Sequence, residues 1–237
     1  MEECPRAILG GGKQAEHVLR LLEWMGLPWN DCLLFDDRYR QARQGTQGRS
    51  IAGTLDDGIR LCCENGLPAI VALGSLVAAV RYATFQKAVK AGVRLVSLIH
   101  PSCVLAPTAS IGRNVVMMPG CVVGPGTEVG SLCCFFSNVT VEHDCRVSDN
   151  VVVGPGSALS GSVRIGAHCF LGTGVVCAPE VTIHDRTLVG SGAVVVSELP
   201  SGNVCYGVPA RAKREVRLGD EVPTESQLHE FCFDSPR

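Results

Sequence analysis

Apolar residues recur at every sixth position through the second half of the chain, from about Ile99 to Pro200. The seventeen positions of this register are all apolar: Ile99, Leu105, Ile111, Met117, Val123, Val129, Phe135, Val141, Val147, Val153, Leu159, Ile165, Leu171, Cys177, Ile183, Val189 and Val195. The residue four positions later is small or β-branched each time: Cys103, Ala109, Val115, Cys121, Thr127, Cys133, Val139, Cys145, Val151, Ser157, Val163, Cys169, Val175, Val181, Thr187 and Ala193. Neither the two-residue period of an ordinary strand nor the 3.6-residue period of a helix gives this pattern.

A period of six is typical of one short strand followed by one corner. Three repeats complete an 18-residue coil of a triangular prism, with the large aliphatic residue inside and the small residue beside it. Glycine often follows the aliphatic residue directly, and we expect it to relieve backbone strain at the corner. These glycines are Gly112, Gly124, Gly130, Gly154, Gly166, Gly172 and Gly190. The repeat predicts a parallel β-helix domain over residues 99–211, followed by a tail over residues 212–237.

The first 98 residues alternate between short apolar runs and segments with helical spacing. Strands are expected at residues 6–9, 32–35, 69–73 and 93–99, and helices at about 15–25, from 54 and at 75–91. Thr54, followed by Asp56 and Asp57, is typical of a helix start. This alternation predicts a Rossmann-like α/β domain with an open parallel sheet.

Ligands of open parallel sheets bind beyond the carboxyl ends of the strands. Residues 10–14, Asp36 with Asp37, and Gly74 all fall at such ends. Glycine amides and a helix N-terminus would suit an anion, so a nucleotide or sugar-phosphate pocket is one interpretation. A tight turn between strand and helix, with no ligand, is the other.

Composition changes this picture little. The chain is 46% hydrophobic and 19% charged, with a net charge of −2, which gives no reason to expect nucleic acid as a partner. No apolar stretch approaches the ~20 residues of a membrane span. The acidic start lacks the basic and apolar regions of a signal peptide, so we expect a cytoplasmic protein with no membrane partner.

Thirteen cysteines, an odd number without a CxxC spacing, argue against both a disulfide framework and a zinc site. The six-residue register offers a simpler interpretation, because it places six of them in the core of the coil. Cys177 holds an aliphatic position, and five others hold the small position: Cys103, Cys121, Cys133, Cys145 and Cys169. We expect these thiols to act as small apolar residues.

One segment of the repeat carries candidate chemistry, Glu142-His143-Asp144-Cys145. The register turns Cys145 inward and leaves the other three residues outside. A carboxylate beside a histidine can fix its tautomer and make it a better base. A surface histidine in a charged turn is the alternative. Gly161, eighteen residues after His143, leaves open space one coil above the imidazole.

These features together resemble one family. The matching segments are Phe35-Asp36-Asp37, His100-Pro101-Ser102, Glu142-His143-Asp144-Cys145, Leu159-Ser160-Gly161, Cys169-Phe170-Leu171-Gly172 and Gly207-Val208-Pro209-Ala210-Arg211. Their order and spacing resemble the bacterial hexapeptide-repeat sugar acyltransferases of the sialic acid O-acetyltransferase and nucleotide-aminosugar N-acetyltransferase type. The resemblance implies a left-handed coil and a homotrimer, with acetyl-CoA in a groove between neighbouring coils. It also implies direct attack of a sugar amine on the thioester, without an acyl-enzyme and without a metal.

The resemblance further implies roles for individual residues. His143 would be the general base and Asp144 its orienting partner. The sugar nucleotide would contact Gly12, Lys13, Gln14, Asp36, Asp37, Gly74 and Asn138. Acetyl-CoA would contact Val152, Gly161, Thr173, Ser191 and Arg211. Three positions depart from the family's pattern: Val152 stands where a second histidine is frequent, Phe136 where an asparagine is, and Lys13-Gln14 where Gly-His is.

Other functions remain open from the sequence. The acceptor could be a sugar hydroxyl or another small amine. A metal-dependent hydratase on the same fold would need three converging histidines, and His143, His168 and His184 have no 18-residue relation. A trimeric scaffold without activity is the alternative outside enzymes.

Overall fold

The computed structural model describes residues 4–37, 45–74 and 78–217, and the chain forms two compact units. The first unit comprises the chain up to Leu98 together with residues 113–116, and the second comprises the remainder. Within the described ranges, no helix has the length and apolar character needed to cross a bilayer.

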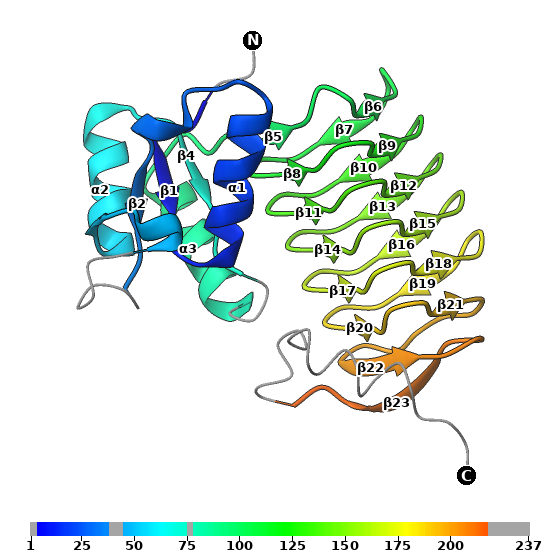
Figure 1. The fold of residues 1–237 in the computed structure, drawn as a ribbon. Coiled ribbons are helices and arrows are strands. Elements are labelled where there is room, and N and C mark those ends of the chain that lie inside the picture. The colour runs from blue at the N-terminus through cyan, green and yellow to red at the C-terminus, as the bar shows by residue number, and fades with distance from the viewer. Residues whose placement is uncertain (1–3, 38–44, 75–77, 218–237) are drawn as a thin grey trace. The chain divides into compact units, whose positions relative to one another are not determined.

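The first unit is built on a four-stranded parallel sheet in the order β3-β2-β1-β4 (Figure 1). The strands are β1 (Ala7–Leu9), β2 (Leu33–Phe35), β3 (Ile51–Gly53) and β4 (Ala69–Val71). The helices are α1 (Lys13–Trp24), α2 (Leu55–Asn65) and α3 (Ala78–Lys90), with short 3-10 turns at Trp29–Asp31 and Thr46–Gly48. Because β2 and β4 pair with opposite sides of β1, the strand order reverses at β1, where open sheets form a crevice.

Local sequence explains the helix ends. Thr54 caps α2: its hydroxyl accepts from the Asp57 N–H, while the Asp57 carboxylate accepts from the Thr54 N–H, which together form a capping box. The same helix ends at Asn65 and is capped by Gly66, which has a left-handed φ of 62°. The helix expected at residues 75–91 is observed from Ala78, and residues 75–77 lie outside the described ranges.

Two expectations for this sheet were wrong. Residues 51–53 form β3, which the pattern did not predict because the segment Ile-Ala-Gly carries little apolar signal. Residues 93–99 do not form one strand of the sheet. Leu95 makes an isolated bridge to Ala69, and Leu98–Ile99 instead forms β5 of the coil.

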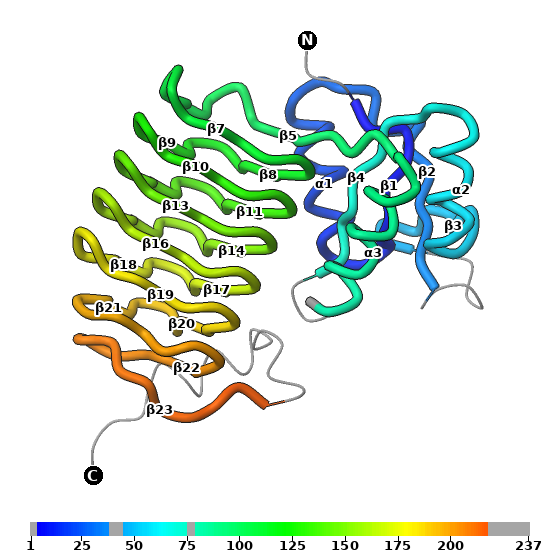
Figure 2. The backbone as a smooth tube through the Cα atoms, turned by 180° about the vertical axis from the view of Figure 1, so that it is seen from behind, coloured from blue at the N-terminus to red at the C-terminus, as the bar shows by residue number. Residues whose placement is uncertain are grey.

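The second unit is a parallel β-helix, as its repeat predicts, and it is left-handed, as the resemblance implies; its stacked coils are visible from both sides (Figures 1 and 2). Its eight-stranded face contains β5 (Leu98–Ile99), β8 (Val116–Met117), β11 (Cys134–Phe135), β14 (Val152–Val153), β17 (Phe170–Leu171), β20 (Leu188–Val189), β22 (Asn203–Tyr206) and β23 (Arg211–Glu215). Its six-stranded face contains β6 (Val104–Leu105), β9 (Val122–Val123), β12 (Thr140–Val141), β15 (Ala158–Leu159), β18 (Val176–Cys177) and β21 (Val194–Val195). Its five-stranded face contains β7 (Ser110–Ile111), β10 (Glu128–Val129), β13 (Arg146–Val147), β16 (Arg164–Ile165) and β19 (Thr182–Ile183).

Neighbouring coils pair in a register of eighteen residues, as in Val141 with Leu159. The second residue of each two-residue strand points inward, so Val141, Leu159 and Phe135 are fully buried. An antiparallel pair, β22 with β23, ends the described part of the coil. Strand β23 continues to Glu215, past the expected start of the tail at residue 212, and residues 218–237 lie outside the described ranges.

The glycines of the repeat have a different role from the one we expected. The left-handed backbone conformation falls three residues after the inward aliphatic position, not one. The residues with positive φ there are Asn114, Gly120, Gly126, Leu132, Asn138, Asp144, Asn150, Gly156, Ser162, His168, Gly174, Glu180, Arg186 and Gly192. The glycine directly after the aliphatic residue serves close approach. A Cβ added to Gly154 would lie 2.6 Å from the carbonyl carbon of Gly172 in the next coil.

The cysteines of the register lie in the core, as predicted. Cys121, Cys133, Cys145, Cys169 and Cys177 are at most 2% exposed, and Cys103 is half-buried. They are more than small apolar residues, because each thiol at the small position donates to a backbone carbonyl fifteen residues later. These bonds are Cys103 to Met118 at 3.2 Å, Cys121 to Phe136 at 3.1 Å, Cys133 to Ser148 at 3.2 Å, Cys145 to Ser160 at 3.2 Å and Cys169 to His184 at 3.0 Å.

Candidate active site

His143 and Asp144 lie at the corner between β12 and β13, where the coil turns from the six-stranded to the five-stranded face. We call this edge of the prism the six–five edge. Both side chains point outward, with 57% of the His143 side chain and 66% of the Asp144 side chain exposed. The site is therefore open to a ligand from solvent.

The two side chains form a pair. His143 Nδ1 lies 2.9 Å from Asp144 Oδ2. A carboxylate can only accept a hydrogen bond, so Nδ1 carries the proton and the lone pair is on Nε2. Asp144 adopts a φ of 56°, a left-handed conformation that aspartate tolerates better than most residues. The pair presents Nε2 as a base.

Neighbouring coils fix the backbone of this corner. The Asp144 N–H donates to the Pro125 carbonyl in the preceding coil at 2.9 Å. The His143 carbonyl accepts from the Ser162 N–H in the following coil, also at 2.9 Å. The imidazole therefore extends from a backbone that is hydrogen-bonded on both sides.

Gly161 gives the imidazole its space. A Cβ added to Gly161 would lie 2.5 Å from His143 Cε1 and closer still to Nε2. Two further glycines adjoin the corner from the preceding coil. A Cβ on Gly126 would lie 2.5 Å from Asp144 Oδ1, and one on Gly124 would lie 2.9 Å from the backbone nitrogen of His143. Sequence reasoning found Gly161 but missed Gly124 and Gly126, although both lie eighteen residues before members of the Glu-His-Asp segment.

Cys145 is not available as a nucleophile. Its side chain is fully buried, and its thiol donates to the Ser160 carbonyl. Burial raises the pKa of the thiol above its ordinary value, so the reactive thiolate is disfavoured.

The other residues that the resemblance implied in the coil lie away from this corner within one chain. Asn138, Thr173 and Ser191 are on the edge where the eight-stranded face meets the six-stranded face, which we call the eight–six edge. Thr173 and Ser191 are one coil apart, and the Thr173 N–H donates to Ser191 Oγ at 3.2 Å. The six-stranded face separates this group from His143.

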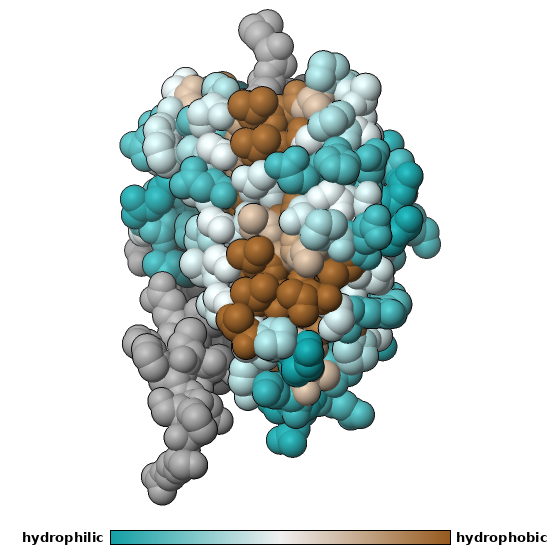
Figure 3. Space-filling view, turned by 90° about the vertical axis from the view of Figure 1, so that its right-hand side faces the viewer, coloured by the Kyte–Doolittle hydropathy of each residue, from teal (hydrophilic) through white to brown (hydrophobic). Residues whose placement is uncertain are grey.

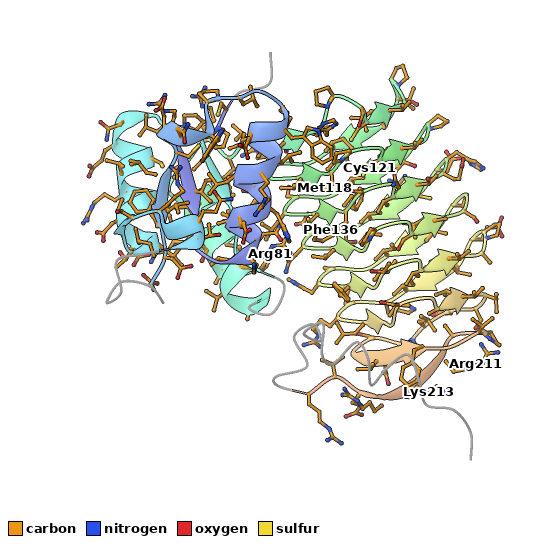
Figure 4. The ribbon with its side chains drawn as sticks, viewed as in Figure 1. Arg81, Met118, Cys121, Phe136, Arg211 and Lys213 are labelled. Carbon is orange, nitrogen blue, oxygen red and sulfur yellow. The ribbon has the colours of Figure 1, made fainter. Side chains whose placement is uncertain are left out.

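Val152 and Arg211 occupy two further places. Val152 is the outward residue of β14 on the eight-stranded face and is 6% exposed. Arg211 begins β23, where its side chain donates to the Ala210 carbonyl at 2.8 Å, and Lys213 of the same strand lies 5.3 Å from the Tyr206 ring (Figure 4). Phe136, at the position where the family pattern has asparagine, follows β11 on the eight–six edge.

In the first unit, the predicted pocket residues gather at the carboxyl ends of the strands. The buried carboxylate of Asp36, after β2, accepts from the Gly11 N–H at 2.6 Å. Asp37 accepts from the Leu55 N–H at the start of α2 at 3.2 Å. Both aspartates thus hold loops of the unit in place. Gly74 follows β4, and a Cβ there would have no neighbour within 4 Å.

Gly12, Lys13 and Gln14 form the start of α1, where Gly12 is the N-cap residue and offers no capping side chain. The Lys13 ammonium lies 3.1 Å from Glu16, and 87% of the Lys13 side chain is exposed. Hydrogen bonds from the side chains of Arg20, the larger cause, and Lys13 lower the pKa of Glu16 to about 2. This carboxylate therefore stays charged at neutral pH. Sequence reasoning missed Glu16, although its i, i+3 spacing from Lys13 is a recognisable signal.

Two residues shape the glycine loop: Gly10, which the sequence already placed at this strand end, and Thr46, which sequence reasoning missed. Gly10 has a φ of 141°, and a Cβ on it would overlap the Ala72 carbonyl group. The close approach of β1 and β4 therefore requires glycine here, and it lets the loop turn toward α1. The Thr46 N–H donates to the Gly11 carbonyl at 2.9 Å and fixes the loop from the other side.

Among the residues that the structure describes, no group of three or more His, Cys, Asp or Glu side chains could hold a metal ion. The histidines of the hydratase alternative have other partners. His168 Nδ1 lies 2.9 Å from Asn150, and His184 pairs with Glu198.

Known proteins share this architecture. Residues 94–201 match the family model of the GMPPB C-terminal domain, and no curated protein sequence matches the chain. A histidine-to-asparagine variant of perosamine N-acetyltransferase from Caulobacter crescentus, in complex with CoA and GDP-perosamine, is 33% identical with a TM-score of 0.79. That likeness covers 90% of this chain and 98% of that one. The acetyltransferase domain of PglB from Neisseria gonorrhoeae, in complex with acetyl coenzyme A, is 30% identical with a TM-score of 0.79, over 89% of this chain and all of that one.

WeeI from Acinetobacter baumannii, at 23% identity and a TM-score of 0.73, shares the fold. The first two structures are at least 30% identical to this chain over about nine tenths of its length, which is sufficient to assign the family. The chain belongs to the hexapeptide-repeat sugar acyltransferase family.

We predict that Gly161→Ala lowers kcat about 10- to 100-fold, because the added methyl group displaces the imidazole by about 1 Å. The measurement is CoA thiol release under saturating substrates, with the melting temperature as the check on folding. In a His143→Ala background the same substitution should have no further effect. An undiminished effect in that background would contradict an action through the imidazole.

Proposed function

We propose that this protein is an acetyl-CoA-dependent N-acetyltransferase that acts on the amino group of a nucleotide-linked amino sugar. One observation carries the proposal: the His143–Asp144 pair presents a free Nε2 at an open corner, on a chain of the family in which a relative binds CoA and GDP-perosamine. The family likeness supports the substrate classes, and the geometry of the corner supports His143 as the base.

The reaction needs one base and no covalent intermediate on the enzyme. The amine nitrogen attacks the thioester carbonyl carbon while His143 Nε2 removes a proton from that nitrogen. As the tetrahedral intermediate collapses, the carbon–sulfur bond breaks, and the CoA sulfur takes the proton from the imidazolium. The products are the amide and CoA thiol. Asp144 stabilises the imidazolium while it holds the proton.

The nucleotide part of the acceptor suits the first unit. The N-terminus of α1 follows the glycine loop at the carboxyl end of β1, and backbone amides there favour an anion. Lys13 adds an exposed cation beside these amides. We assign the phosphates of the acceptor to this loop.

We also propose a homotrimer. The outward residues of the six-stranded face form an apolar strip that includes Val104, Val122 and Val176, which are 63%, 37% and 43% exposed. Figure 3 shows apolar side chains gathered along this side of the coil. An exposed apolar strip of this kind supports an interaction surface.

A second copy on this face would also explain the separation of the site residues. A threefold arrangement would bring the six–five edge of one copy, with His143, to the eight–six edge of the next, with Thr173 and Ser191. A groove between the two copies would then contain both the base and the acetyl-CoA contacts.

We expect His143→Ala to lower kcat by about 10² to 10⁴-fold without a loss of folding, because it removes an exposed general base. CoA release is measured with acetyl-CoA and a panel of GDP- and UDP-linked amino sugars, with hydroxyl analogues of the same sugars beside them. Faster turnover of the hydroxyl analogues would assign O-acetylation instead, and no turnover with any acceptor would favour the scaffold.

Lys13→Ala should raise KM for the nucleotide sugar roughly three- to tenfold and leave kcat unchanged, because an exposed cation contributes only ground-state binding. Lys90→Ala, which removes an exposed lysine at the end of α3, is the matched control. An unchanged KM in Lys13→Ala would contradict the assignment of the acceptor's phosphates to this loop.

Val176→Asp should break the trimer, because it places a charge in the apolar strip. Sedimentation at several concentrations measures the assembly. Ser110→Asp, on the exposed five-stranded face, introduces the same charge and should leave the assembly intact. A parent protein that sediments as a monomer at every concentration refutes the trimer.

A further inference from the structure

Thr127 lies one coil before the catalytic corner and is fully buried. Its hydroxyl makes two hydrogen bonds to that corner. It donates to the Glu142 carbonyl at 2.7 Å and accepts from the Cys145 N–H at 3.1 Å. The two bonded groups bracket His143 and Asp144, so one oxygen atom joins both ends of the four-residue corner.

This pattern of two hydrogen bonds from one side chain is uncommon within the coil. Most residues at the same register position are cysteine, which only donates to a carbonyl, or valine, whose side chain neither donates nor accepts. Ser157 repeats the pattern, since its hydroxyl donates to the Gly172 carbonyl at 3.0 Å and accepts from the Val175 N–H at 3.1 Å. That second corner contains Thr173. The two bridging hydroxyls therefore hold the corner of the proposed base and a corner of the proposed acetyl-CoA edge.

We propose that Thr127 is a positioning residue for the reaction, acting through the His143–Asp144 pair; this rests on the proposed function. The pair depends on two adjacent side chains that converge from a left-handed corner, and their 2.9 Å contact changes with the backbone angles between residues 142 and 145. The hydroxyl bridge fixes the distance between the ends of that segment. Thr127 is shielded from solvent, so it touches no substrate and is not itself catalytic.

The test is Thr127→Val, which removes both hydrogen bonds and keeps the shape of the side chain. Valine fits this position, because the coil already has it at Val115, Val139, Val151, Val163, Val175 and Val181. Thr127→Ser retains the hydroxyl. Thr187→Val is the matched control: Thr187 is equally buried, donates to the Pro200 carbonyl at 2.8 Å, and follows His143 by more than two coils of the chain.

We expect Thr127→Val to lower kcat about tenfold with KM for acetyl-CoA unchanged. Thr127→Ser should restore most of the rate, and Thr187→Val should turn over like the parent. Adding Thr127→Val to His143→Ala should cause no further loss. An equal fall of kcat in Thr187→Val, or a full further loss in the double variant, would overturn the proposal.

A second readout does not depend on turnover. In NMR spectra of histidine-labelled protein, the imidazole signal that disappears in His143→Ala identifies His143. That signal should shift or broaden in Thr127→Val and stay in place in Thr187→Val. If the parent acetylates no sugar, the proposed function fails while this measurement still decides the role of Thr127; an unmoved His143 signal overturns it.

Discussion

The vertical spacing of the coils is the constraint on which the second unit depends. Parallel strands stack about 4.8 Å apart, and every corner passes over the corner eighteen residues earlier at that distance. Where backbone faces backbone, no Cβ fits, which explains the glycines at Gly112, Gly154 and Gly172. Where a corner carbonyl lacks a partner along the strand direction, a thiol or hydroxyl from the interior supplies a donor. Packing and hydrogen bonding thus follow from one repeated distance.

The site uses the same constraint. His143 occupies the room that a glycine leaves in the next coil, and Asp144 occupies the left-handed corner position that the fold repeats every six residues. Aspartate, asparagine and glycine are the residues that best tolerate this conformation, so the acid that we propose orients His143 stands where the backbone already favours it. The site requires no departure from the geometry of the coil. It requires particular side chains at positions that the coil provides.

Much of this was predictable because an 18-residue period converts sequence spacing into spatial neighbours. It placed Cys145 inside, His143 outside and Gly161 beside the imidazole, as the structure has them. The same period could not reveal which glycines have positive φ, because the positions one and three residues after the aliphatic residue both recur every six residues. Strand β3 was missed because Ile51–Gly53 is short and carries almost no periodicity. The bridging role of Thr127 was missed because the register marks only its size, not the two groups that its hydroxyl reaches.

The regular coil also acts as a ruler. Thr173 and Ser191 lie one coil apart on the eight–six edge, and each full coil adds one fixed rise of about 4.8 Å along the axis. An extended ligand laid along such an edge meets contacts at intervals set by the number of coils, independent of side-chain length. Insertion or deletion of one whole coil would conserve every local contact of the fold and still change the length of ligand that the edge can match.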